Sequence, residues 1–355
     1  MSKSRLVMGI LVVLILGALL PTAAVSSGTE ASPLLQSTSG VYTEDFSTYT
    51  AKDYVEETNW DIWAQALQLA HIDSTSQNAP AIAMESNGNA VVVWTDYRNG
   101  NSDIYAQKID SSGNRLWAAD LRVNTDSGTA SQYWPAVAMD SSGNTVVVWM
   151  ESVNVYAQKL SNNGNKLWAA DLRVNMATGK AANRGPAVAV NSNGDIIVSW
   201  AAYLNNYYDC DIYAQKLNSN GIRLWTADLR VNSDTGTTLQ WQPAIATDNS
   251  NNTIVVWTDE RTGDQDIYAQ KINNSGSKLW AVDLRANSDV KTGDQWLPAV
   301  AVDNSDSIVI VWRGGDIYAQ KVDSSGSRLW AADLRVNSYE GVGTQLYPAV
   351  AVDSS

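Results

Sequence analysis

Aromatic residues and glutamine lie near each other in the sequence at one recurring position of this 355-residue chain. The phrase Pro-Ala-(Ile/Val)-Ala occurs six times, and aromatic residues such as Trp134, Trp241 and Trp296 precede several of the prolines. A glutamine lies three residues before the proline in five of the six copies. This pairing suits carbohydrate, because sugar C–H groups stack on aromatic rings and sugar hydroxyl groups bond to amides. The alternative is that the rings fill gaps between repeated units.

A second set of candidate residues lies in segments whose length varies from repeat to repeat. Loops of variable length on a constant scaffold often carry binding residues, although solvated loops that have drifted in length are the alternative. The sequence predicts one ligand site that combines these loops with the aromatic residues before the prolines. The expected contacts are Trp134, Tyr203, Tyr207, Tyr208, Trp241 and Trp296, with Arg98 and Arg261 as polar anchors.

Catalytic groups are scarce in the repeated part of the chain. One histidine and one cysteine leave neither Ser-His-Asp chemistry in the repeats nor a thiolate or multi-histidine metal cluster. Near-identical repeats supply like residues around a ring, whereas a catalytic centre needs unlike residues at one point. The sequence therefore predicts a protein that is not an enzyme, with a glycan-cleaving enzyme as the alternative.

Calcium is the metal that the loop composition would suit, since two loops are rich in Asp and Asn oxygens. Neither loop has the spaced acidic pattern of an EF-hand, and Asp in a loop before Gly is ordinarily a turn residue. We expect no metal and no cofactor. The weak calcium candidates are Asp96, Asp103, Asp259, Asp264 and Asp266.

The elements that hold these residues repeat every 50 to 57 residues, from one Pro-Ala-(Ile/Val)-Ala phrase to the next. Each unit begins with an alternating strand at the proline, followed by a Gly-containing turn and a β-branched run that ends in Trp. After a connection of variable length come Tyr-Ala-Gln-Lys, a second Gly-containing turn and a last short strand. This order predicts a four-stranded antiparallel meander.

Four strands in 50 to 57 residues match one blade of a β-propeller. An immunoglobulin-like sandwich needs about seven strands in about 100 residues, and a solenoid coil is shorter. The sequence predicts an all-β fold, a β-propeller of four-stranded antiparallel blades, with six or more blades in the complete protein. The expected repeat region is 59–355, with blades at about 80–134, 135–185, 186–242, 243–297 and 298–347 and partial strands in 59–79 and 348–355.

The phrases Trp94-Thr-Asp-Tyr-Arg98, Asp103-Ile-Tyr-Ala-Gln-Lys108 and Gly113-Asn-Arg-Leu-Trp117 cycle with Pro-Ala-Val-Ala. They resemble the tandem repeats of secreted β-propeller-like surface proteins of bacteria and archaea. The resemblance covers about residues 60 to 355, and it implies the fold and an extracellular setting without a particular activity. The second turn is also faintly similar to the Asp-box of sialidase propellers. Its Trp, however, lies four rather than three residues after Gly, and the internal Asp is missing.

The N-terminus has the order of a secretory signal peptide. Lys3 and Arg5 precede an apolar run from Leu6 to Leu20, and small residues follow Pro21. We expect a signal peptide over 1–26, because the run falls short of the ~18–20 residues that span a bilayer core. An uncleaved membrane anchor is the alternative. Residues 27–58, rich in Ser and Thr, are expected to form a lead-in or spacer.

The formal net charge of −13 argues against nucleic acid as a partner, because nucleic-acid binding needs a basic surface. We predict a secreted or cell-surface binding and adhesion module with no stable membrane span after cleavage of the signal peptide. Its expected partner is an extracellular polysaccharide, a glycoprotein or a cell-surface protein. The alternatives are a glycan-cleaving propeller enzyme and a structural spacer of the cell envelope.

Overall fold

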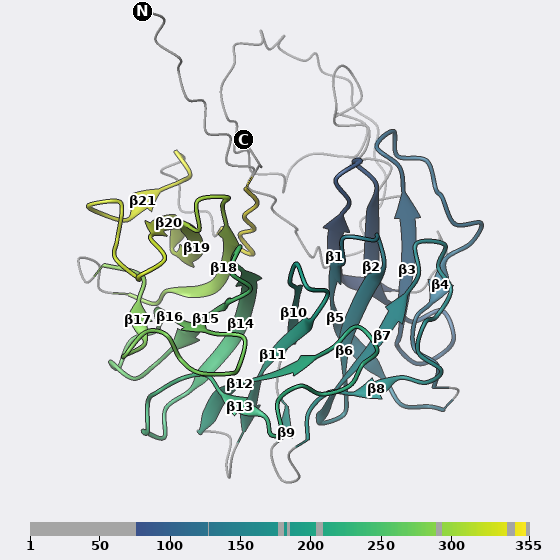
Figure 1. Cartoon of the computed structure of the whole chain (residues 1–355), viewed down its shortest axis with the longest axis horizontal. Helices are drawn as coiled ribbons and strands as arrows, with labels where there is room; N and C mark the ends of the chain where they lie inside the picture. Colours follow the sequence, from purple (N-terminus) through teal and green to yellow (C-terminus); the bar gives the residue numbers. More distant parts are fainter. Residues whose placement is uncertain are drawn as a thin grey trace, which may run out of the picture.

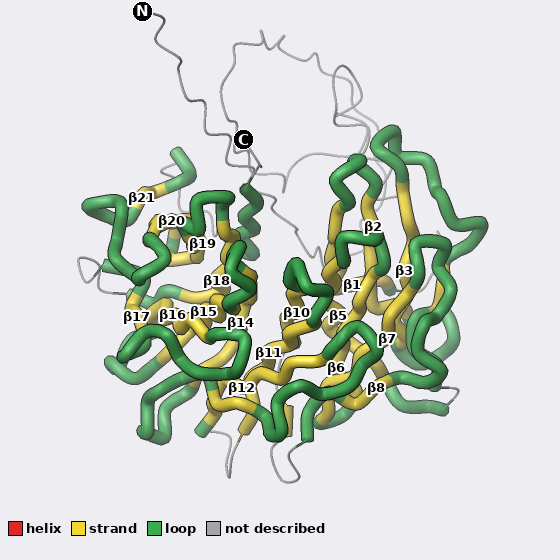
Figure 2. The backbone as a smooth tube through the Cα atoms, in the orientation of Figure 1, coloured by secondary structure: helices red, strands yellow, loops and turns green. Residues whose placement is uncertain are grey.

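The computed structural model describes residues 76–352, except 127, 177–180, 183–184, 204–208, 289–292 and 339–344. The expected signal peptide (1–26), the lead-in (27–58) and most of the first partial repeat lie outside the described residues. Described residues form five antiparallel sheets, each with its four main strands in chain order (Figures 1 and 2). Sheets of this kind follow from the predicted meander, and the expectation of an all-β propeller is confirmed.

The strand bounds are as follows. The first sheet has β1 (Gln77–Met84), β2 (Ala90–Asp96), β3 (Asp103–Ile109) and β4 (Leu121–Arg122). The second has β5 (Gln132–Met139), β6 (Thr145–Glu151), β7 (Asn154–Leu160) and β8 (Leu172–Arg173). The third has β10 (Ala187–Val190), β11 (Ile196–Tyr203), β12 (Cys210–Leu217) and β13 (Leu229–Arg230), and the short β9 (Ala181–Ala182) pairs with β11. The fourth has β14 (Gln240–Thr247), β15 (Thr253–Asp259), β16 (Asp266–Ile272) and β17 (Leu284–Arg285). The fifth has β18 (Trp296–Val302), β19 (Ile308–Gly314), β20 (Asp316–Val322) and β21 (Leu334–Arg335).

The first strand of each sheet lies on the inside of the propeller. Strands β1, β5, β10, β14 and β18 contact one another in that order, and Figure 1 shows them toward the middle of an arc of sheets. The end of each sheet at which its second and third strands are connected is here called the top face. The opposite end, which carries the turn between the first and second strands and the turn after the third strand, is called the bottom face. Every inner strand therefore begins at the top face.

Apolar packing between neighbouring sheets forms the core. Val91 and Val93 of β2 pack with Val147 and Trp149 of β6, and all four side chains are fully buried. The alternation of apolar side chains along each β-branched run supplies both faces of a sheet, because successive residues of a strand point to opposite sides. Among the described residues, no helix is long and apolar enough to cross a membrane.

A second tryptophan joins each sheet to the next at the bottom face. Trp117 donates its indole N–H to the carbonyl oxygen of Asn162 in the following sheet, at 3.2 Å. Trp168, Trp225 and Trp280 make the equivalent bond at 3.4 Å. These tryptophans come from the Leu-Trp phrase that is repeated at constant spacing, so the constant spacing serves the contact between sheets.

Four of the five inner strands are irregular just before the proline. The pairing register of β5 with β6 shifts between Tyr133 and Ala136, and β1, β14 and β18 shift at the same place. In these four strands the residue before the proline has a positive φ, for example 54° at Trp134. A bulge of this kind bends the strand and re-aims a side chain, at a cost of about 1–2 kcal/mol for a residue other than glycine. It decides which side chains emerge at the top face.

Candidate functional site

At the top face of the first sheet, an arginine side chain lies over a tyrosine ring. The Arg98 guanidinium lies over the ring of Tyr105, 4.2 Å from its centroid, and forms ion pairs with Asp96 at 2.6 Å and Asp120 at 3.1 Å. Asp96 is fully buried and also accepts the indole N–H of Trp94 at 2.8 Å. Burial disfavours the charged carboxylate, but the hydrogen bonds from Arg98 and Trp94 outweigh it and hold the pKa of Asp96 below its ordinary value.

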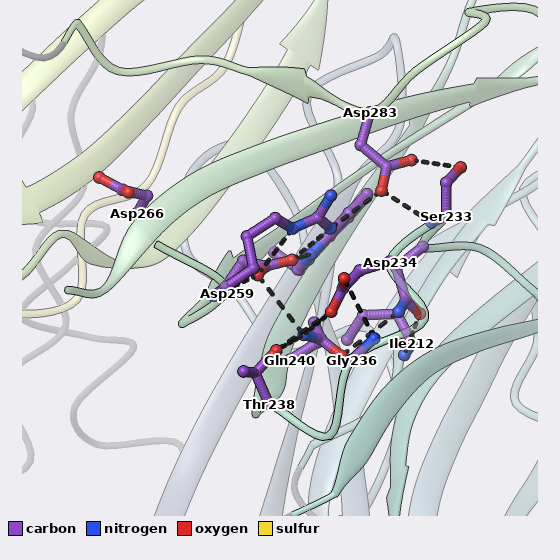
Figure 3. A network of polar contacts seen from close by, with 12 residues as sticks. Ile212, Ser233, Asp234, Gly236, Thr238, Gln240, Asp259, Asp266 and Asp283 are labelled. Carbon is purple, nitrogen blue, oxygen red and sulfur yellow. Dashed lines mark hydrogen bonds and ion pairs between the residues drawn. The ribbon is translucent and has the colours of Figure 1, made fainter. Parts of the chain in front are cut away.

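The fourth sheet has the same arrangement of an arginine, a tyrosine and two aspartates. Arg261 lies 4.2 Å from the ring centroid of Tyr268 and pairs with Asp259 at 2.6 Å and with Asp283 at 2.9 Å. Figure 3 shows Asp259 and Asp283 within the surrounding polar network. The side chains of both arginines are less than one-fifth exposed, at 18% for Arg98 and 19% for Arg261. Both guanidinium groups are engaged inside the chain, so a role as ligand anchors stays a prediction.

The expected calcium candidates are likewise engaged by protein groups. Asp103 accepts hydrogen bonds from Arg122 at 2.6 Å and Asn124 at 2.9 Å, and Asp266 has the equivalent partners in the fourth sheet. Asp96 and Asp259 are held by their arginines, and Asp264 is exposed. Within the described ranges, no group of three or more His, Cys, Asp or Glu residues is placed to hold a metal ion.

Unlike the first and fourth sheets, the second sheet has no described arginine over its top. Glu151 ends β6 at the position that Asp96 and Asp259 take in their strands, and only two residues connect it to Asn154 at the start of β7. Such a short connection leaves no room for the arginine that follows two residues after Asp96. Tyr156, the counterpart of Tyr105, is therefore half-buried. The four equivalent tyrosines of the other sheets are only 4–7% exposed.

Glu151 is held by one hydrogen bond rather than by an ion pair. Gln132 donates its side-chain N–H to Glu151 Oε2 at 2.8 Å, and Gln132 accepts from Asn124 of the first sheet at 3.0 Å. No described cation pairs with the Glu151 carboxylate. Beneath it, the indole N–H of Trp149 is buried and has no hydrogen-bond partner among the described residues. Glu151 is thus a partly exposed carboxylate that no described residue neutralises by an ion pair.

Two aromatic rings stand beside this carboxylate. Tyr133 and Trp134 meet edge to face, with ring centroids 5.2 Å apart, and the Tyr133 hydroxyl donates to the Ser152 carbonyl at 3.2 Å. Trp134 is 43% exposed, because its positive φ turns the side chain out of the strand alternation. The next sheet has Gly185 at the equivalent position, so it places no side chain next to Trp134. The rings form an open aromatic surface.

Charges of both signs surround Tyr156. Burial raises the pKa of its hydroxyl, and the negative charges of Glu151, Asp171 and Asp126 raise it further, while Arg173 lowers it. Arg173 lies opposite Tyr156 in the strand pairing. The corresponding arginines of the other four sheets pair with an aspartate. In the second sheet that aspartate is replaced by Asn154, and Arg173 forms no ion pair with a described residue.

The structure distributes the predicted contact residues over several sheets. Trp134 lies in the second sheet, beside Glu151. Tyr203 and Trp241 are half-buried and pack against one shared apolar cluster between the third and fourth sheets. Trp296 is covered by Arg313, whose guanidinium carbon is 4.4 Å from the ring centroid. Tyr207 and Tyr208 lie outside the described residues.

Sequence reasoning missed Gln132, Glu151, Tyr156 and Arg173. The signal was present, since the second repeat has Glu where others have Asp, Asn154 where others have Asp, and a short variable connection. Such departures from a repeat mark the place where one unit differs from its copies. We regard the top face of the second sheet, comprising these four residues with Tyr133 and Trp134, as the candidate site.

Comparison with known proteins supports the fold. The sequence matches no protein-family model and no curated protein. A protein of unknown function from Dyadobacter fermentans has a similar structure, with a TM-score of 0.57, 10% identity and coverage of 78% of this chain and 86% of the other. An α-L-arabinofuranosidase from Fusarium graminearum gives 0.53 and 11%, covering 76% and 82%. An α-L-arabinanase from Penicillium chrysogenum, solved with arabinobiose, gives 0.50 and 13%, covering 71% and 80%.

The expectation that the chain is not an enzyme is contradicted by these likenesses, because two of the three similar structures are glycoside-cleaving enzymes. Its premise, that repeated blades offer only like residues, is wrong at the top face. Arginine covers the first and fourth sheets, whereas the second sheet exposes a glutamate, an aromatic pair and an arginine that forms no ion pair with a described residue. The chain is thus similar in fold to propellers that include glycoside-cleaving enzymes, and its blades are not chemically equivalent.

Proposed function

We propose that this protein is a glycan-cleaving β-propeller whose substrate binds at the top face of the second sheet. One observation carries the proposal. Three sheets have a carboxylate at the end of the second strand, and Glu151 is the only one of the three that no described arginine neutralises. The likeness to an arabinanase and an arabinofuranosidase supports glycan as the substrate class.

Each group at the site has a role in this proposal. The exposed Trp134 ring stacks on the C–H face of a sugar residue. Arg173 bonds to its hydroxyl groups, since a guanidinium donates hydrogen bonds. Gln132 is fully buried and acts through Glu151, which it holds by a hydrogen bond. Glu151 transfers the proton at the glycosidic oxygen. Its neighbours suit that task, because it combines partial burial with a single hydrogen bond.

Glycoside hydrolysis requires a second carboxyl group near the first. In the proposal, Asp126 is this second carboxyl group. It lies on the connection from the first sheet to the second, and its charge, like that of Glu151, acts on Tyr156. Its Oδ1 accepts one backbone N–H, from Gly128 at 2.8 Å, and it forms no ion pair with a described residue. Asp171 is less suitable, because it already accepts bonds from Thr125 and Gln158.

The expected setting is outside the cell or at its surface, where polysaccharides, glycoproteins and cell-surface proteins are accessible. This part of the proposal is supported by the basic residues, apolar run and small residues at the N-terminus. Determining the N-terminal residue of the protein recovered from culture medium or from the cell surface tests it. Recovery only from the cell interior with an intact N-terminus would contradict it.

Hydrolysis tests the activity. The purified chain is assayed on arabinan, on other plant and bacterial polysaccharides and on chromogenic glycosides. Glu151→Gln is expected to lower kcat by about 10²–10⁴-fold, the usual contribution of general acid–base catalysis. The matched control is Glu260→Gln, which alters a glutamate of the fourth sheet's top face and is expected to leave kcat unchanged. No hydrolysis of any substrate, or full activity of the Glu151 variant, would overturn the proposal.

A further inference from the structure

The bottom face carries a hollow between the second and third sheets that the top-face chemistry does not use. Its volume is about 480 Å³, within the range of small-molecule sites. The lining includes the indole of Trp168, the ion pair of Lys159 with Asp140, and the turn residues Asn193 and Ser219. The hollow is therefore bordered by one aromatic group and several hydrogen-bonding groups.

The first cause of the hollow lies in the inner turns, which connect the first and second strands of each sheet. The fourth residue of the turn has a positive φ in every sheet. In the fourth sheet this residue is Asn251, which accepts hydrogen bonds from the Ser192 N–H at 2.9 Å and hydroxyl at 2.8 Å in the preceding sheet. Asp306 of the fifth sheet bonds in the same way to Asn249. The third sheet has Gly194 instead, and an added Cβ there would meet nothing within 4 Å.

The second cause lies in the outer turns, which follow the third strand of each sheet. Asn162 of the second sheet accepts from Lys108 of the first at 2.5 Å, and Asn274 accepts from Lys216 in the same way. The third sheet has Ser219 at this position, and its shorter side chain leaves Lys159 with Asp140 alone. The fifth sheet also has a serine there, but its inner turn carries Asp306. Among the four described pairs of neighbouring sheets, only the second and third lack both space-filling side chains.

The charge of the lining favours a neutral ligand. Lys159 Nζ lies 2.9 Å from Asp140 Oδ2, and the two side chains are 5% and 9% exposed. Burial opposes the charge on Asp140, but hydrogen bonds from Asn144 and Lys159 outweigh it and lower its pKa. Asp140 is consequently a carboxylate at neutral pH, and its ion pair with Lys159 balances the two charges. An ammonium carries three N–H donors, so Lys159 retains donors for an incoming hydroxyl group.

We infer that this hollow binds one or two residues of a neutral oligosaccharide, at a site separate from the top face. Trp168 provides an aromatic surface for the C–H groups of a sugar ring, because its side chain is only half-buried and lines the hollow. Lys159, Asn193 and Ser219 bond to its hydroxyl groups. The inference goes beyond the proposed hydrolysis, since a bottom-face site would hold a glycan without cleaving it.

The experiment fills the hollow with the side chains that the chain itself uses elsewhere. The double variant Gly194→Asn, Ser219→Asn copies Asn251 and Asn274, and an asparagine tolerates the positive φ of residue 194. The control Ser324→Asn makes the same change in the fifth sheet. Arabinobiose, xylobiose and cellobiose are titrated into each protein, and the indole N–H signal of Trp168 is followed by NMR. The Glu151→Gln background prevents hydrolysis of the probes.

At least one disaccharide is expected to shift the Trp168 signal saturably. The filled variant should bind it at least about tenfold more weakly, the loss typical of removing one well-packed contact. The control should keep the parent affinity. No saturable shift with any of the three sugars, or equal affinity of filled variant and parent, would overturn the inference. A shift without any hydrolysis by the wild-type chain would refute only the proposed activity, and hydrolysis without a shift would refute only this site.

Discussion

The indole ring of Trp117 lies against Gly164 of the next sheet so closely that a Cβ on Gly164 would stand 3.1 Å from Cε2. The turn glycines at 221, 276 and 326 face Trp168, Trp225 and Trp280 at similar distances. Backbone conformation alone does not require these glycines, because Asn251 and Asp306 adopt a positive φ in the inner turns. The tryptophan contact between sheets is what excludes a side chain from the outer turns.

Gly164→Ala is expected to destabilise the fold more than Gly194→Ala. Both residues have nearly the same φ, 81° and 79°, so both variants incur the cost of about 1–2 kcal/mol for a left-handed alanine. Only the methyl group at 164 also meets an indole, which adds about 1–3 kcal/mol of overpacking. Urea denaturation followed by circular dichroism measures the difference. Equal midpoints for the two variants would show that the ring moves aside freely.

Removing Arg261 should weaken the fold strongly. Asp259 and Asp283 would lose their cation, and the carboxylate of Asp259 is fully buried. Breaking a buried pair by removing one partner costs about 3–5 kcal/mol, so we expect Arg261→Ala to lose that order of unfolding free energy. Asn163→Ala, at an exposed turn position, should stay within about 0.5 kcal/mol of the parent. A similar small loss for both would mean that water replaces the guanidinium.

Stability should fall in acid. Hydrogen bonds and ion pairs outweigh burial and lower the pKa of Asp140, Asp248 and Asp303, each of which begins an inner turn. The unfolded chain, with Asp near pKa ~3.9, then binds protons that the folded chain does not, so stability decreases as the pH falls below about 4. Thermal unfolding between neutral pH and pH 3 measures the loss. Asp248→Asn should make the melting temperature depend less steeply on pH in this window.

Trp134→Ala tests the aromatic part of the proposed active site. The side chain is 43% exposed, so its removal should change stability little while weakening substrate binding. If the ring stacks equally on substrate and transition state, KM rises and kcat remains near that of the parent. Tyr347→Ala is the matched control, because Tyr347 also precedes a repeat proline with φ 54° and is 53% exposed. An unchanged KM for Trp134→Ala would place the substrate elsewhere.

The sequence was sufficient for the fold because its periodicity repeats the same hydrophobic pattern, turns and Leu-Trp phrase in every unit. It also identified Trp134 as a candidate contact residue. It did not single out Glu151, although the change from Asp and the short connection are both visible in the sequence. Which of these carboxylates an arginine neutralises became clear only from the side-chain contacts. Arg98 and Arg261 were expected to face a ligand, yet buried carboxylates hold them. Their partners Asp120 and Asp283 follow about twenty residues later in the chain, a separation that no local pattern reveals.

The left-handed residue before five of the six repeat prolines has one further consequence. Ala79, Trp134, Gln242, Leu297 and Tyr347 share almost the same φ, from 50° to 54°, although their side chains have nothing in common. The main chain at this point is therefore dictated by the strand pairing around it and not by the group it bears. A substitution of this side chain in one blade leaves the other blades undisturbed. The ligand preference of the top face can therefore change one residue at a time while the fold stays the same.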